Sequence, residues 1–68
     1  MIEYYSLAHE LRKKQGITAK ELGRKVGMSD RSIFLYEQGQ RIPPVDVAER
    51  IAEELNYKGK LSQMFRIY

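Results

Sequence analysis

The chain of 68 residues contains no cysteine, no tryptophan and only one histidine, His9. Without cysteine it has neither disulfide bonds nor thiolate metal sites. His9 has no second imidazole or thiolate with which to build a metal site, and we expect it on the surface or half-buried in the first helix. No nucleophile with a partnered base and no glycine-rich phosphate loop can be identified. We therefore expect no enzymatic activity, no metal and no cofactor.

Long apolar stretches are also missing. No run approaches the roughly 18 residues that a membrane-spanning helix requires, and the first residues lack the basic and then apolar form of a signal peptide. Repeats, low-complexity tracts and alternating strand patterns are absent too. The length and the 43% hydrophobic content predict a single cytoplasmic domain over residues 1–68. A core of this size supplies only about 3 to 5 kcal/mol of net stability, so self-association would help to hold it.

Helix signals are concentrated in the middle of the chain. Thr18 precedes Glu21 by three residues, a spacing at which the two side chains can cap the start of a helix reciprocally. Leu22 and Val26 recur four residues apart and give that helix one apolar face. The pattern predicts a helix over residues 18–26.

A second helix is predicted directly after the first. Gly27 can take the left-handed conformation that ends a helix, Ser29 can cap a new one, and Gly39 can terminate it. This helix, over residues 29–38, has an inner side formed by Ile33, Tyr36 and Glu37. Two short helices joined by so few residues must cross steeply, which is the usual arrangement for placing a helix against DNA.

The rest of the chain also shows helical periodicity. Apolar residues at helical spacing predict three further helices, over residues 4–14, 45–55 and 60–68. Pro44 suits the start of the second of these, because its missing N–H would have no partner there. The apolar face of the first is expected to contain Tyr4, Leu7, Ala8 and Leu11. The fold class is therefore all-α with five helices.

Positive charge is concentrated on the segment with the paired helices. The whole chain has a net charge of +3, but residues 12–41 contain eight Lys or Arg against three acids, a balance of +5, and the remainder has a balance of −2. A basic face of this kind is expected if the segment meets phosphate groups. The alternative is a solvated basic face without a partner.

The chain resembles the helix-turn-helix family of the phage repressors, Cro proteins and XRE-type bacterial regulators over roughly residues 4 to 57. The positions that carry the resemblance are residues 11–18, Glu21, Leu22, Val26, Gly27, Ser29, Ser32, Ile33, residues 35–39 and Pro43. The resemblance implies a compact five-helix, lambda-repressor-like DNA-binding domain. It also implies double-stranded DNA as the partner and a homodimer that represses transcription by occupying a near-palindromic operator.

The resemblance places the helix over residues 29–38 in the major groove. The matching base-contacting positions are Ser29, Asp30, Arg31, Ser32 and Leu35. Arg31 is the strongest candidate, because a guanidinium can donate two bonds to guanine. Its alternative role is a phosphate contact or a surface charge, whereas Asp30 is favoured in a first helical turn by the helix dipole regardless of DNA.

The resemblance also assigns phosphate contacts and one ion pair. The phosphate-contacting candidates are Thr18, Lys20, Gln38, Gln40 and Arg41. Many relatives carry Gln where this chain has Ala19, which removes one expected contact, and often Ala where it has Gly23. Relatives pair the residues matching Arg12 and Glu37, so a structural ion pair is expected between them.

Two alternatives concern protein contacts. The last helix offers Leu61, Met64, Phe65 and Tyr68 either as a dimer interface or as the closure of the monomer core. The competing function is a protein-interaction module, antitoxin-like or a co-regulator, that binds a protein partner through Phe34, Leu35 and this C-terminal face.

Overall fold

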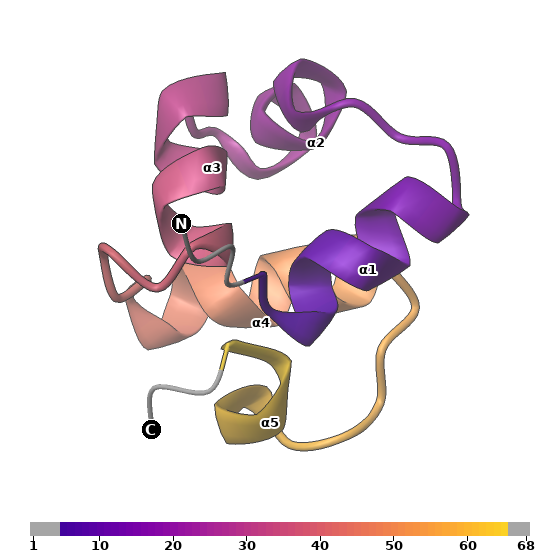
Figure 1. Cartoon of the computed structure of the whole chain (residues 1–68), viewed down its shortest axis with the longest axis vertical. Coiled ribbons are helices and arrows are strands. Elements are labelled where there is room, and N and C mark those ends of the chain that lie inside the picture. Colours follow the sequence, from indigo (N-terminus) through magenta and orange to yellow (C-terminus); the bar gives the residue numbers. More distant parts are fainter. Residues whose placement is uncertain (1–4, 66–68) are drawn as a thin grey trace.

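The computed structural model describes residues 5–65 and contains five α-helices in that range (Figure 1). They are α1 (Leu7–Lys14), α2 (Ala19–Val26), α3 (Asp30–Glu37), α4 (Val45–Glu54) and α5 (Leu61–Phe65). The described part of the chain has no strand, so the all-α prediction and the count of five are confirmed. None of the helices in this part is long and apolar enough to cross a membrane.

The first helix is shorter than predicted. It begins at Leu7 because the backbone of Ser6 is extended, and the Ser6 N–H donates 3.0 Å to the carbonyl of Glu37 on α3. The predicted place of Leu7 on the apolar face is wrong, since its side chain is 38% exposed, while Ala8 is buried. Tyr4 lies outside the described residues.

Both helices of the predicted motif have the ends that their sequences indicate. The Glu21 N–H donates to Thr18 Oγ1 at 3.0 Å, and the Ser32 N–H donates to Ser29 Oγ at 3.1 Å. Gly27 ends α2 in the left-handed conformation with φ of 79°. Each of the two helix starts is therefore capped by a residue within three positions of the N–H that it accepts.

One apolar core joins all five helices. Its buried side chains are Ala8, Ala19, Leu22, Val26, Ile33, Tyr36, Val47, Ala48, Ile51, Ala52, Leu55, Met64 and Phe65. Helix α2 packs against α3 and α4, and α5 closes the other end of the core against α1 and α4 (Figure 1).

The last helix requires a correction. Met64 and Phe65 were candidates for a dimer interface, but both side chains are completely buried within the chain and Leu61 packs against the same core. Burial removes the first two from any surface that a second copy could reach. Of the two alternatives, closure of the monomer core therefore holds for this pair, and Tyr68 lies outside the described residues.

Candidate nucleic-acid interface

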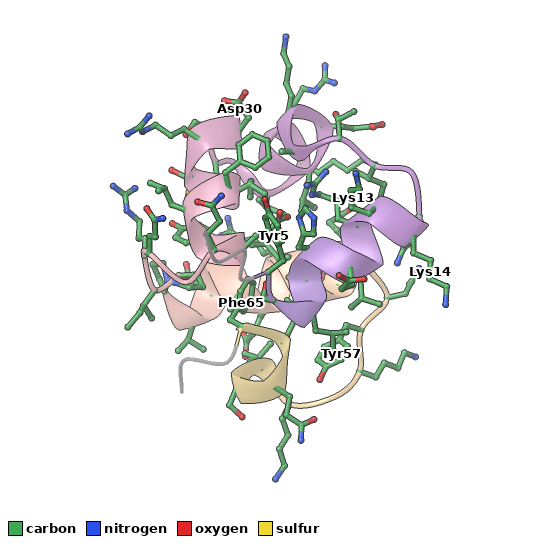
Figure 2. All side chains as sticks on the ribbon, viewed as in Figure 1. Tyr5, Lys13, Lys14, Asp30, Tyr57 and Phe65 are labelled. Carbon is green, nitrogen blue, oxygen red and sulfur yellow. The ribbon has the colours of Figure 1, made fainter. Side chains whose placement is uncertain are left out.

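The N-terminal half of α3 is exposed to solvent on one side. Ser29, Asp30 and Arg31 are exposed, Ser32 and Leu35 are half-buried, and Figure 2 shows Asp30 at the free end of the helix. The opposite side of α3 is buried through Ile33, Tyr36 and Glu37. The five base-contact candidates therefore belong to the side of α3 that the core leaves uncovered.

Three of these five side chains already have intramolecular partners. Ser29 Oγ accepts from the Ser32 N–H and donates to Ser32 Oγ at 3.1 Å, so both hydroxyls belong to the cap of α3. Asp30 Oδ1 accepts from the N–H of Arg31 at 2.8 Å, which is the role expected of an acid in a first helical turn. The Arg31 side chain has no hydrogen bond or ion pair to another described residue. Its guanidinium is thus free to bind an external acceptor.

The loop after α3 folds back onto the helix. The carbonyl of Leu35 accepts from the backbone N–H groups of Gln40 and Arg41 at 3.0 and 3.3 Å. The side chain of Arg41 then reaches Ser32, with Nη1 3.5 Å from Oγ. The structure thus brings one predicted phosphate contact, Arg41, next to the first turn of α3.

The other predicted phosphate contacts are more scattered. Lys20 and Gln40 are exposed and Gln38 is half-buried. Thr18 and Lys20 lie at the start of α2, whose eight residues span about 12 Å before the turn to α3. The positive end of the α2 helix dipole lies at this start, where an N–H group not used by the cap could meet a phosphate.

Arg12 and Glu37 meet in the interior between α1 and α3. Arg12 Nε and Nη2 donate to the two Glu37 carboxylate oxygens at 2.7 and 3.1 Å, and Nη1 donates to the carbonyl of Ile17 at 2.9 Å. Arg12 is 5% exposed and Glu37 is 2% exposed. A pair buried this deeply ties α3 to α1 and to the segment before α2, so it serves structure and leaves Arg12 unavailable to DNA.

His9 was missed as a partner of this pair. Its Nδ1 lies 2.8 Å from Glu37 Oε1. The contact joins residues 28 positions apart, so no local pattern reveals it. The only signal is that His9 and Arg12 are three residues apart and share a face of α1.

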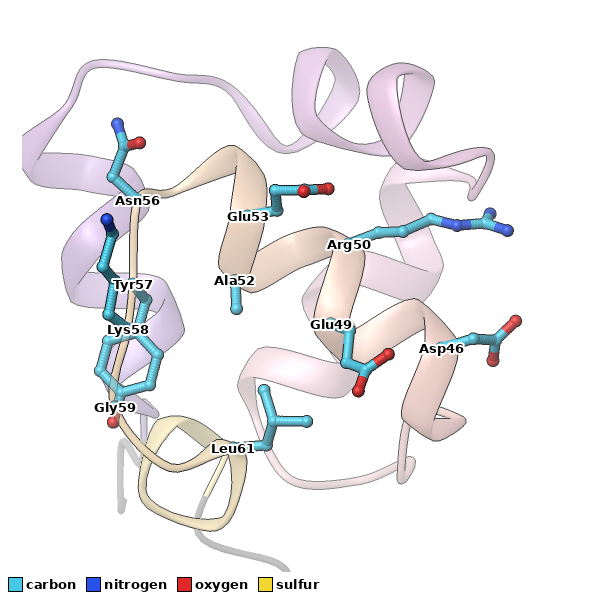
Figure 3. A pocket seen from close by; sticks show the side chains of 10 residues that line it. All are labelled: Asp46, Glu49, Arg50, Ala52, Glu53, Asn56, Tyr57, Lys58, Gly59 and Leu61. Atoms are coloured by element: carbon cyan, nitrogen blue, oxygen red, sulfur yellow. The ribbon is translucent and has the colours of Figure 1, made fainter.

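Several acidic residues lie on α4. The residues that line a hollow beside α4 and residues 56–61 include the acidic Asp46, Glu49 and Glu53 together with Arg50 and Lys58 (Figure 3). Carboxylates repel phosphate, so this face is unsuited to DNA. Nowhere in residues 5–65 do three or more His, Cys, Asp or Glu side chains gather in a way that could hold a metal ion.

The apolar patch of the alternative hypothesis is reduced to one clearly exposed side chain. Phe34 is 44% exposed, with the guanidinium carbon of Arg12 5.8 Å from its ring centroid, whereas Leu35 is half-buried. Of the C-terminal residues proposed to extend the patch, Met64 and Phe65 are buried in the core and Leu61 is half-buried against it.

Comparison with known proteins agrees with this geometry. The family model described as helix-turn-helix matches residues 9–61. An uncharacterized HTH-type transcriptional regulator of Methanothermobacter thermautotrophicus is 38% identical over 50 residues, which are 74% of this chain and 72% of that protein. No solved structure matches the chain significantly.

Two longer relatives match about two thirds of the chain. A protein of Thermococcus kodakarensis, provisionally named an HTH-type transcriptional regulatory protein, is 38% identical over 47 residues, 69% of this chain. A protein of Pyrococcus furiosus with the same kind of name is 41% identical over 44 residues, 65% of this chain. The match covers only 15% and 14% of these two proteins. With the family model matching most of its length, the chain belongs to the helix-turn-helix family of the XRE, Cro and phage-repressor type.

Proposed function

We propose that the chain is a sequence-specific DNA-binding transcriptional regulator that reads the major groove with α3. The observation that carries the proposal is the exposed first turn of α3, where the Arg31 guanidinium has no partner among the described residues. The names of the relatives as HTH-type transcriptional regulators support the same function.

Some side chains of the α3 region are proposed to contact bases, and others cap the start of the helix. Arg31 is proposed to donate two bonds to guanine O6 and N7, and Leu35 to contact a thymine methyl. Asp30 first serves the helix start, and its second carboxylate oxygen remains for a cytosine amine. Ser29 and Ser32 keep their capping bonds and contribute through their position beside the bases.

Phosphate contacts are proposed on both sides of α3. Gln40 and Arg41 follow its C-terminal end, with Gln38 beside them, and the start of α2 offers Thr18 and Lys20. These contacts would fix the register of the domain on the duplex without reading sequence. They would also make the affinity fall steeply with salt, because each neutralised phosphate releases counterions.

We further propose that two copies repress transcription by occupying a near-palindromic operator. Two identical recognition helices about 34 Å apart match one turn of DNA. Repression is the simplest mechanism here, because it requires only that the bound domains cover the site.

The proposal is tested by selecting binders from a pool of random duplex DNA at two salt concentrations. We expect an enriched near-palindrome with half-sites about one turn apart. Arg31→Ala should lose discrimination at one base position of each half-site by about 1 to 3 kcal/mol. Lys13→Ala removes the same charge from α1, away from α3 (Figure 2), and should keep the preference.

One outcome of the selection would contradict this proposal. Retention that is strongly salt-dependent but without any enriched sequence would contradict operator binding. The protein-interaction alternative, favoured by the exposed Phe34, predicts that Phe34→Ala abolishes function while Arg31→Ala does not.

A further inference from the structure

Three residues, one before α1 and two on it, contact Glu37, the last residue of α3. The Ser6 N–H donates to its backbone carbonyl at 3.0 Å, and His9 and Arg12 approach its carboxylate from α1. The last carbonyls of a helix have no partner within it. Here one of them is taken by a residue that precedes α1.

The His9 contact has a defined direction. An ionised carboxylate only accepts hydrogen bonds, so the His9 Nδ1 that lies 2.8 Å from Glu37 Oε1 must carry a proton and donate. Arg12 Nη2 lies farther from the same nitrogen, at 3.4 Å, and finds its acceptor in Glu37 Oε1 at 3.1 Å instead. Glu37 Oε1 thus accepts from two different residues of α1.

Tyr5 and Ser6 support this contact from the N-terminal side. The Tyr5 ring stacks on the His9 imidazole with centroids 4.0 Å apart and planes inclined by 19°. Ser6 is completely buried, yet its hydroxyl has no hydrogen-bond partner among the described residues. Its burial therefore serves the backbone bond to Glu37 and not the side chain.

We propose that Tyr5, Ser6 and His9 form a clamp that positions the C-terminal end of α3 and thereby sets its sequence selectivity. The selectivity part rests on the proposed function. Helix α3 has eight residues and is about 12 Å long. If it pivots about its middle, a displacement of its C-terminal end moves the base-contacting side chains near its N-terminal end by a similar distance. The clamp residues are positioning residues that act through Glu37 and touch no base.

Two substitutions of His9 separate its two contacts. His9→Phe keeps a ring for Tyr5 to stack on but removes the donor to Glu37. His9→Asn keeps an N–H donor near the place of Nδ1 but removes the ring. The amides to follow are those of Gln38, Gly39 and Gln40, which close the end of α3 by hydrogen bonds to Phe34, Tyr36 and Leu35.

The measurement combines hydrogen exchange of these amides in the free protein with affinity for selected and unrelated duplexes. His9→Phe should raise exchange at the end of α3 and lower affinity for the selected duplex about tenfold, the effect of one bond to a charged group. Affinity for the unrelated duplex and its salt dependence should not change, and His9→Asn should restore most of the protection. Leu7→Ala, an exposed apolar residue of the same region, serves as the control.

Tyr5→Ala covers the case in which His9→Phe fails to fold, because Tyr5 is 40% exposed and lies outside the core. It should raise exchange at the end of α3 without unfolding the chain. Unchanged exchange at the end of α3 in every folded variant would overturn the clamp. Faster exchange in a protein that shows no sequence preference for DNA would instead support the clamp and reject the proposed function.

Discussion

Gly23 is the residue at which helix propensity and packing disagree. A Cβ at this position would overlap the backbone carbonyl oxygen of Met28 and lie 3.2 Å from the carbonyl carbon of Ser29. The Met28 N–H also donates to the Gly23 carbonyl at 2.7 Å. The missing side chain therefore lets the turn between α2 and α3 lie directly against α2.

This contact determines whether a side chain at position 23 raises or lowers the stability of the chain. Gly23→Ala would gain up to about 1 kcal/mol from helix propensity, but the backbone must shift to remove the overlap, which costs about 1 to 3 kcal/mol. We expect a net loss of stability in urea unfolding. The neighbouring exposed substitution Arg24→Ala should change stability by no more than about 0.5 kcal/mol. A Gly23→Ala variant more stable than the parent chain would show that the turn accommodates the extra carbon at little cost.

At the same scale, the sequence predicts some site residues better than others. The order of residues along α3 is enough to place Arg31 outside and Ile33 inside, because helical periodicity decides both. The contact of His9 with Glu37 is not predictable in this way, since it depends on how α1 crosses α3. The family resemblance pointed to Arg12 as the partner of Glu37 and gave no indication of His9.

At the scale of elements, helix ends with local causes were predicted correctly. The caps at Thr18 and Ser29 and the left-handed Gly27 involve residues no more than four positions apart, so their sequence is sufficient. The predicted start of α1 at residue 4 was wrong. The helix begins at Leu7, because the N–H of Ser6 is bonded to the carbonyl of Glu37 at the C-terminal end of α3. Ser is a common N-cap residue, but the Ser6 side chain makes no capping hydrogen bond, so this boundary depends on a tertiary contact that local sequence does not show.

The cap of α3 yields a separate prediction. Ser29→Ala removes the acceptor of the Ser32 N–H, and we expect a loss of about 1 kcal/mol in the free energy of unfolding. Ser29→Asn retains a capping oxygen and should recover most of that loss. Thermal and urea unfolding of the three proteins measure it. Equal stability of Ser29→Ala and the parent chain would mean that solvent satisfies this N–H as well as the hydroxyl does.

At the scale of the whole molecule, most basic residues and a group of acidic residues lie on different elements. The basic residues gather on the motif segment, and the carboxylates of Asp46, Glu49 and Glu53 lie on α4 (Figure 3). The uneven charge was visible in the sequence, because it follows from composition along the chain. The role of α5 was not, because an apolar helix face has the same pattern whether it meets its own core or another copy.

The buried face of α5 makes the two roles experimentally distinct. Phe65→Ala removes a completely buried ring, which costs about 3 to 5 kcal/mol and equals the net stability expected of a core this small. We expect circular dichroism to show a largely unfolded chain at 25 °C, whereas Phe65→Leu, which leaves a smaller void, should remain folded. If Phe65 instead served only to join two copies, Phe65→Ala would give a folded monomer in sedimentation experiments. Because the Phe65 side chain has no exposed surface in the single chain, Phe65→Ala should unfold the protein at every protein concentration.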